Sequence, residues 1–332
     1  MDDSVTAISY HDTVNDLQDL DWSDAGPFAR LQWFALLEES GIAPLFATAT
    51  AHGNGIILPL HRSANGLEAL TNWYAFTWSD LRAGDMASEA MLEALARDLR
   101  QRTHRLTLRK VPDEDGTLAR LTRAFRQAGW VVLAEACDTN HVLPVAGRSY
   151  AAFLADRPGR LRTTLKRKAK KVDVSLSTEF EPSNWQAYED IYAESWKPAE
   201  GDPALLRAFA MAESAAGRFR FALARHQGKP VAAQFWTVDG DTAYIHKLAH
   251  RSDADALSPG TTLTAALFER VIDTDGVEWV DFGTGDDPYK RDWMEQVRTR
   301  WQVTCLRPAA PRNWPFVAKH LLRKLVSGGA DG

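Results

Sequence analysis

The sequence has 332 residues, of which 45% are hydrophobic and 25% are charged. These proportions are typical of soluble globular proteins and exclude a disordered or collagen-like chain, and the length predicts about two domains. The 39 Lys and Arg against 44 Asp and Glu leave a net charge of −5, which argues against a nucleic-acid coat over the whole surface and against DNA as a partner.

Cysteine usage and hydropathy bear on the compartment. Cys137 and Cys305 lie far apart without the spacing of zinc ligands, so we expect two reduced thiols and no metal site. The first residues lack the basic and apolar stretches of a secretory signal. No apolar run approaches the ~18 residues of a membrane-spanning helix. We therefore expect a cytoplasmic protein that can contact a membrane at its inner face.

The first half of the chain predicts a helix, two hairpins and a β–α–β crossover. In chain order the expected elements are a helix over 31–41, strands over 46–51, 56–60 and 67–76, a helix over 88–102 and a strand over 105–111. The third of these strands carries Trp73 and Tyr74, which we expect to line a groove for an acceptor substrate.

A Pro- and Gly-containing segment at 144–150 predicts the joint between two domains, 1–145 and 146–332. Residues 157–171 follow, with eight basic and no acidic residues. Apolar residues at helical spacing predict that one face of this helix packs on the protein, namely Leu161, Leu165, Ala169 and Val172. The bases would then form either a solvated face or a cationic surface suited to phosphates or anionic lipid.

The second half repeats the order of the first. Its expected elements are a helix over 205–217, strands over 221–226, 231–238 and 242–250, a helix over 261–272 and a strand over 277–283. The two copies are offset by about 170–175 residues, too long for a solenoid unit. The sequence therefore predicts an α/β protein, of the α+β type with mixed sheets, built from two related domains.

Several motifs lie in or just before the second copy. They are the basic segment 157–171, the sequence ESWK at Glu194–Lys197, the hairpin GKPVAAQFW, SPG at 258–260 and DFGTGDDPYKRDW at 281–293. With them the chain resembles the GNAT superfamily of acyltransferases, and more closely its tandem-domain branch with the FemAB transferases and CelD-like acyltransferases. The resemblance implies two tandem GNAT-like domains and a sheet whose central strands splay apart. An acyl-CoA thioester would lie in that gap as co-substrate, attacked by an amine, with no permanently bound cofactor.

The SPG motif would begin a helix where the superfamily usually holds the CoA pyrophosphate. Ser258 suits an N-cap, Pro259 suits the first helical position and Gly260 leaves backbone N–H groups open. Thr261 and Thr262 add hydroxyl donors, and the alternative is an ordinary capped helix. Lys247, unusual in a central strand, needs solvent or an anion, and a CoA phosphate or an acidic substrate would serve.

The proton-transfer candidates lie on the strand before this helix and on the loop after it. Alternation places His246 with Tyr244 and Leu248, and Lys247 with Ile245 on the opposite face. His246 is the leading proton acceptor, with Asp281 as the other candidate. The donor to the leaving thiolate is Tyr289. Lys290 completes the catalytic set, and two carboxylates should contact substrate, Asp286 and Asp287. The alternative is a loop held together by its own Asx turns and a Lys–Asp pair.

Aromatic residues and the tail suggest an apolar or amphipathic substrate. Tyr192 and Trp196 either fill core or line the groove, and the chain has 12 tryptophans. Residues 313–327 predict a short basic amphipathic helix that docks on the protein or lies on an anionic membrane.

The function expected is an acyl-CoA-dependent N-acyltransferase whose acceptor is an amino-lipid. The chain also resembles the bacterial ceramide synthases, which implies a long-chain acyl donor and a sphingoid-type amine. Two alternatives remain open. One is a FemAB-like transferase that takes an aminoacyl group from tRNA to a cell-wall precursor, and the other is a non-catalytic binding module of envelope or polysaccharide assembly. The first domain lacks counterparts of SPG and DFGTGDDPYK, so we expect it to bind no cofactor.

Overall fold

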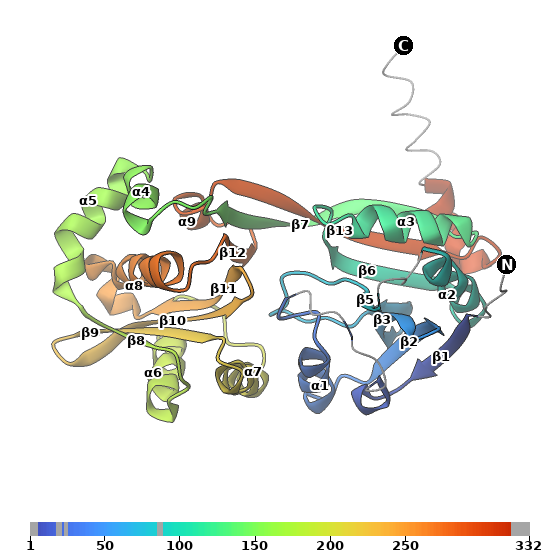
Figure 1. The fold of residues 1–332 in the computed structure, drawn as a ribbon, viewed down its shortest axis with the longest axis horizontal. Coiled ribbons are helices and arrows are strands. Elements are labelled where there is room, and N and C mark those ends of the chain that lie inside the picture. Colours follow the sequence, from blue (N-terminus) through green and yellow to red (C-terminus); the bar gives the residue numbers. More distant parts are fainter. Residues whose placement is uncertain (1–5, 18–21, 23–25, 85–88, 320–332) are drawn as a thin grey trace, which may run out of the picture. The chain divides into compact units, whose positions relative to one another are not determined.

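The computed structural model describes residues 6–17, 22, 26–84 and 89–319. The chain forms two compact units (Figure 1). Unit 1 comprises Met1–Asp138 and Arg298–Gly332, and unit 2 comprises Thr139–Val297. The boundaries differ from the predicted division at 145/146, because the chain returns to unit 1 after Val297.

Unit 1 is a mixed sheet covered by helices. Its strands lie in the order β1 (Ala7–His11), β2 (Pro44–Ala51), β3 (Asn54–Ser63), β4 (Gly66–Ala69), β6 (Arg105–Val111) and β13 (Gln296–Leu306), and β5 (Leu81–Ala83) pairs with β3. The helices are α1 (Leu31–Glu39), α2 (Glu89–Arg102) and α3 (Thr117–Gln127), with a 3₁₀ turn at Val14–Leu17 and another at Pro311–Asn313. The buried side chains of α2 recur every three or four residues, which places one helix face against the sheet: Met91, Leu92, Leu95, Ala96 and Leu99.

Unit 2 has the strand order β7 (Val131–Pro144), β12 (Trp279–Thr284), β11 (Thr242–His250), β10 (Lys229–Asp239), β9 (Phe219–His226) and β8 (Asp173–Ser177). Strand β7 begins in unit 1 and belongs to unit 2 from Thr139 onward. Figure 1 shows two helices on one face of this sheet, α6 (Pro182–Ala193) and α7 (Pro203–Ala215). The other face carries α4 (Tyr150–Ala155), α5 (Gly159–Lys168) and α8 (Pro259–Glu269), which continues as a π-helical turn at Arg270–Thr274. Three short elements complete the unit: α9 (Pro288–Arg291) and 3₁₀ turns at Ala169–Lys171 and Ser252–Leu257.

The two units repeat one pattern. The series β2, β3, β4, α2, β6 in unit 1 matches β9, β10, β11, α8, β12 in unit 2. In each series two antiparallel hairpins are followed by a helix and a strand that pairs in parallel with the strand before that helix. The predicted internal repeat is therefore confirmed.

The two repeats exchange their closing strands. Strand β7 follows β6 and α3 along the chain, yet it pairs with β12 of unit 2. Strand β13 follows β12 and α9, yet it pairs with β6 of unit 1. This exchange explains the second boundary at Val297, which the repeat pattern alone does not reveal.

The strand expected over 67–76 ends at Ala69, and residues 70–80 form a loop. Its backbone carbonyl groups bind a side chain in place of a sheet partner, since Lys110 Nζ donates to Asn72 O at 3.0 Å and to Ala75 O at 2.6 Å. Further along, Trp78 N–H donates to Lys110 O at the end of β6 and Trp78 Nε1–H to Pro59 O of β3. Unit 1 thus packs Trp78 beside the middle of β3 and the end of β6.

The predicted basic helix over 157–171 forms as α5 and the turn at Ala169–Lys171, with Leu161, Leu165 and Val172 buried. The tail helix predicted over 313–327 lies beyond the described residues from 320 onward. In its described part Trp314 and Phe316 are exposed.

Candidate functional site

The central strands of unit 2 separate. Strands β11 and β12 pair in parallel only from Thr242–Trp279 to Tyr244–Asp281, although β11 continues to His250 and β12 to Thr284. Beyond this point the facing edges of the two strands are not hydrogen-bonded to each other. The sheet therefore has an opening in its middle, as the resemblance implied.

A β-bulge at the start of this opening reorients two side chains. Phe235 of β10 pairs with Lys247, and the next residue, Trp236, pairs with Ile245, so His246 is the extra residue. His246 contacts Phe209 of α7, and Lys247 reaches the loop between α6 and α7. The prediction that they point to opposite faces is wrong, because the bulge interrupts the alternation of β11.

His246 is held among aromatic rings. It stacks on Phe235 with ring centroids 5.0 Å apart, and its Nε2 lies 2.8 Å from Thr237 Oγ1. Burial, with a further contribution from the charge of Lys247, lowers the pKa of His246 to about 3. The imidazole is therefore neutral near pH 7 and a weak proton acceptor.

We expect a His246→Gln variant to retain turnover within about fivefold of wild type, well short of the ~100-fold loss that removal of a general base causes. Glutamine can still bond to Thr237, so packing should survive. The measurement is CoA release from acyl-CoA by wild type and variant across pH 6–9. A loss of 100-fold or more would restore His246 as the proton acceptor.

The ammonium of Lys247 pairs with a carboxylate of the protein itself. Its Nζ lies 2.7 Å from Glu200 Oε1, both side chains are at least nine-tenths buried, and Tyr188 Oη donates to Glu200 Oε2 at 3.0 Å. The ring of Tyr192 lies 5.4 Å from the same ammonium, and burial followed by the charge of Glu200 raises the pKa of Tyr192 to about 12. Lys247 therefore already has a carboxylate partner in place of the expected phosphate or acidic substrate.

Lys197 lies on the same loop as Glu200, near the ion pair of Glu200 and Lys247. The sequence did not predict it as a site residue. Burial and the positive charges of Lys247 and Lys290 lower the pKa of Lys197 to about 8, while Glu200 and Asp287 act in the opposite direction. The ESWK motif was the only signal at this position, and the charges that matter come from distant parts of the sequence.

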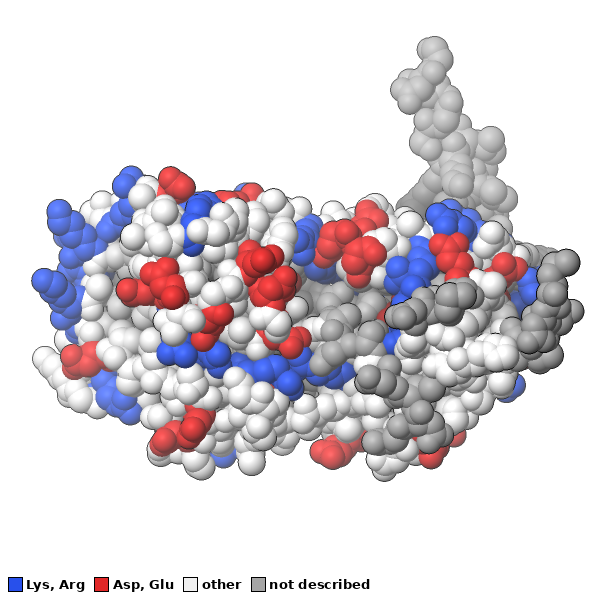
Figure 2. All heavy atoms as spheres, in the orientation of Figure 1, with Lys and Arg blue, Asp and Glu red and all other residues white. Residues whose placement is uncertain are grey.

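The SPG turn differs from the expected cap. Ser258 has a left-handed backbone (φ 50°) and its side chain caps no N–H group. Its Oγ instead accepts a hydrogen bond from Lys168 Nζ of α5 at 2.9 Å. Pro259 opens α8, and Thr262 is buried with its hydroxyl directed back to Ser258 O. The basic helix thus lies beside the start of α8, and Figure 2 shows Lys and Arg gathered over α5 at the left edge of the view.

A buried polar chain runs from β10 to α9 beneath the start of α8. Gln234 accepts from Trp236 Nε1 at 2.9 Å and donates to Gly260 O at 2.9 Å and to Thr264 Oγ1 at 2.7 Å. The hydroxyl groups of Thr264 and Tyr289 lie 2.8 Å apart. Burial raises the pKa of Tyr289 to about 12. The phenol is therefore protonated at neutral pH, as a proton donor must be.

Asp281 and Lys290 hold the loop after β12. Asp281 accepts from Gly283 N at 2.7 Å and from Asn140 Nδ2 at 3.1 Å. Lys290 Nζ donates to Gly283 O at 3.2 Å and to Thr284 O at 2.5 Å. Gly283 has φ 69°, which glycine adopts without strain. These contacts favour the alternative in which both residues organise the turn.

The two carboxylates expected to contact substrate are also bonded within the loop. Asp286 is exposed and bonds to Arg291 at 2.5 Å and to His141 Nε2 at 3.1 Å. Asp287 caps α9 by accepting from Tyr289 N at 2.9 Å. Both stay close to Tyr289 along the chain.

The aromatic candidates fall into two groups. Trp196 is 56% exposed, with its ring 4.2 Å from that of His250 at the end of β11. Tyr192 is buried beneath Lys247. In unit 1 Trp73 is 74% exposed, whereas Tyr74 is only 7% exposed, so only Trp73 offers a surface to a substrate.

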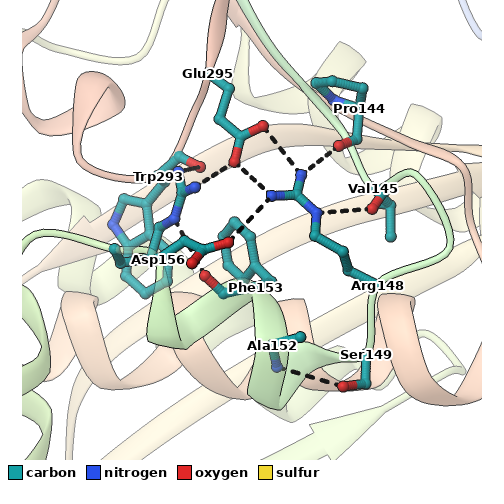
Figure 3. Close-up of polar contacts among 10 residues, drawn as sticks. Pro144, Val145, Arg148, Ser149, Ala152, Phe153, Asp156, Trp293 and Glu295 are labelled. Carbon is teal, nitrogen blue, oxygen red and sulfur yellow. Dashed lines mark hydrogen bonds and ion pairs between the residues drawn. The ribbon is translucent and has the colours of Figure 1, made fainter.

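Next to α4, two arginines bind one glutamate in an ion-pair cluster of Arg148, Arg157 and Glu295. In Figure 3 Glu295 lies against Arg148, which also donates to the carbonyl groups of Pro144 and Val145. Arg157, which is 7% exposed, donates to the same carboxylate and to Trp293 O. Hydrogen bonds from both arginines hold the pKa of Glu295 below its usual range. This ion-pair cluster connects the segment after β7 to the segment after α9.

Among the described residues no group of three or more His, Cys, Asp or Glu side chains is arranged to hold a metal ion. No helix in the described part of the chain has the length and hydropathy needed to span a membrane.

Residues 159–291 match the model of the acetyltransferase (GNAT) domain. The matched segment lies within unit 2 and contains β11, α8, Lys197 and Tyr289. No curated protein matches the sequence significantly.

Solved structures share the fold over most of the chain. A conserved protein of unknown function from Bacteroides thetaiotaomicron is 14% identical, with a TM-score of 0.62 over 90% of this chain and 100% of its own. FemX is 9% identical, with a TM-score of 0.61 over 89% and 96%. L-PGS from Bacillus licheniformis is 11% identical, with a TM-score of 0.58 over 90% and 99%.

The protein therefore has the predicted mixed α/β fold of two related units, and residues 159–291 of the second unit match a GNAT acetyltransferase domain. None of these three structures is described as a ceramide synthase, so the sphingoid acceptor remains a prediction.

Proposed function

We propose that the protein is an N-acyltransferase that moves an acyl group from a CoA thioester to an amine by direct attack. The observation that carries the proposal is the opening between β11 and β12, with the protonated Tyr289 beside it at the start of α8. Beyond Tyr244 the edge of β11 is not hydrogen-bonded to β12, and it offers backbone N–H and C=O groups to an extended acyl-pantetheine arm. Tyr289 then donates a proton to the departing sulfur.

The start of α8 supplies the anion site. Backbone N–H groups of its first turn, around Gly260 and Thr261, favour a pyrophosphate, and Lys168 adds a positive charge beside Ser258. Exposed Lys and Arg of α5 continue this surface. In unit 1 Trp78 is buried beside the middle of β3 and the end of β6, which supports the expectation that only unit 2 binds CoA.

We further propose a long-chain acyl donor and an amino-lipid acceptor, with a sphingoid-type base, giving a ceramide, as the first acceptor to test. The exposed Trp196 at the end of β11 and the basic α5 suit an amphipathic molecule presented at an anionic membrane on the cytoplasmic side.

A second candidate is aminoacyl transfer from tRNA, as in FemAB-like enzymes. The basic surface of α5 would suit RNA phosphates equally well, and such binding would weaken steeply with salt. The shared fold with FemX and L-PGS is compatible with both candidates.

The test is a thermal-shift series with acyl-CoAs from C2 to C18, free CoA and tRNA. Stabilisation that grows with acyl length would support the lipid proposal, and stabilisation by short acyl-CoAs alone would keep the transferase and remove the lipid. A response to tRNA with none to any CoA would favour the second candidate. No response to either would favour a non-catalytic binding module.

We expect Gly260→Ala to weaken CoA binding about tenfold, or ~1.4 kcal/mol, without harming the fold. An added Cβ would lie 3.5 Å from His250 Nδ1, an ordinary contact, so alanine fits. A methyl group here obstructs the close approach of a phosphate. The measurement is CoA affinity by calorimetry, and Gly159→Ala is the control because its added Cβ meets nothing within 4 Å. Unchanged CoA affinity would place the pyrophosphate elsewhere.

A further inference from the structure

An amine that attacks a thioester must first lose a proton, and the expected acceptors of that proton are engaged. The low pKa of His246 makes it a weak base, and Asp281 accepts hydrogen bonds on both oxygens. Lys290 is bound to two carbonyl groups, and Lys247 to Glu200.

Lys197 differs from these groups. Its ammonium makes no hydrogen bond or ion pair with any described residue, although its side chain is partly buried. Its backbone N–H donates to Ser195 Oγ at 3.3 Å, and its Nζ lies 5.9 Å from the centre of the Trp196 ring. The charges facing it are Lys247 from β11, Glu200 from its own loop, and Lys290 and Asp287 from α9.

The pairing of Glu200 explains why Lys197 has no close counter-ion. Glu200 is already bonded to Lys247 and Tyr188, and Asp287 is bonded to the backbone of Tyr289. A second ammonium beside an ion pair that is already neutral loses its proton readily. A lysine in this setting is poised near neutral pH, which suits a general base.

We propose that the neutral Nζ of Lys197 accepts the proton that the acceptor ammonium loses before it attacks the acyl group. This inference rests on the proposed acyl transfer and adds the base that the transfer lacked. The acceptor R–NH₃⁺ gives one proton to Lys197 and becomes R–NH₂. Its nitrogen then forms the C–N bond as the C–S bond breaks. The thiolate takes its proton from Tyr289, and the second proton lost by the nitrogen restores the phenol. Lys197 then returns its own proton to solvent.

The experiment compares wild type with Lys197→Arg and Lys197→Met, and takes Lys229→Met on the exposed β9–β10 turn as control. CoA release is measured from pH 6 to 10 with aliphatic amines, from ethanolamine to a sphingoid base, and with hydroxylamine, which is already neutral. We expect wild-type kcat/KM with aliphatic amines to rise with pH and level off near pH 8. Both Lys197 variants should lose about 100-fold, whereas hydroxylamine should be affected far less.

Lys197→Arg separates a base from a cation, because arginine keeps the charge and cannot accept the proton. An arginine variant near wild-type activity would overturn the proposal and leave Lys197 as an anion-binding group. Thermal shift by acyl-CoA should be unchanged in every variant.

A second measurement needs no acceptor. The rate at which acetic anhydride labels each lysine is followed by mass spectrometry from pH 6 to 11, and Lys197 should reach half of its maximal reactivity near pH 8. Reactivity that follows exposed lysines such as Lys229 would overturn the proposal. A wild type that neither binds nor consumes any acyl-CoA would overturn the proposed function, and this inference with it. Active Lys197 variants beside an active wild type would overturn this inference alone.

Discussion

Tyr289→Phe is expected to lower kcat by about 100-fold, the loss typical of a missing general acid. The phenol is the protonated end of the chain through Thr264 and Gln234, and phenylalanine cannot donate to the thiolate. The ring contacts with Phe282 and Trp293 should persist. Thr264 keeps its bonds to Gln234 and Gly260, so the fold should be intact. The readouts are single-turnover CoA release and acyl-CoA affinity, and the affinity should not change.

Tyr150→Phe is the matched control, since this partly buried tyrosine of unit 2 packs in the same core without contacting the α8 network. Because the pKa of Tyr289 is about 12, the wild type should show no loss of rate from this group up to about pH 10. If Tyr289→Phe and Tyr150→Phe have the same rate, the thiolate takes its proton from water.

Glu295→Gln is expected to destabilise unit 2 by about 2 kcal/mol, since hydrogen bonds to a charged group are lost while Arg157 stays buried. For a unit of this size the midpoint of thermal unfolding should fall by about 5 °C. Thermal and urea unfolding would measure this loss of stability. Glu179→Gln is the control, because that exposed side chain forms no described ion pair.

The loss should depend on pH in one direction. The arginines lower the pKa of Glu295 in the folded state, so its contribution is fully present above its unfolded pKa, about 4.3, and disappears as the pH falls through the folded value. Wild type and Glu295→Gln should therefore converge in stability at acidic pH. A difference that persists unchanged below the folded pKa would show that the carboxylate charge is not its source.

Much of the fold was predictable because local patterns determine it. The hairpins of unit 2 follow from alternating apolar residues around glycine turns, and α8 follows from Ser-Pro-Gly before an apolar run. The strand exchange was not predictable, because no local feature of β7 or β13 indicates which strand it pairs with. The strand predicted over 67–76 ends at Ala69, because carbonyl groups of the following loop are bound by Lys110, a residue far along the chain.

The site was predictable in part for a similar reason. Motifs located Tyr289, Gly260 and His246 on neighbouring elements. The folded chain links Gly260 and Tyr289 through Thr264 of α8, whereas His246 packs against α7 on the other face of the sheet. The bulge at His246 was not readable from alternation, and neither was the pairing of Lys247 with Glu200. The lowered pKa of Lys197 comes in part from charges on β11 and α9, which only the folded chain brings near it.

The exchange of closing strands also governs the order in which the chain can fold. As the chain leaves the ribosome, β6 appears long before β13, and β7 long before β12. Both early strands therefore wait with an edge that lacks its final partner, a state in which chains tend to aggregate. Strand β12 completes β7 first, and β13 then completes β6. The amino-terminal repeat, although made first, is therefore completed after the second repeat, once β13 has been made.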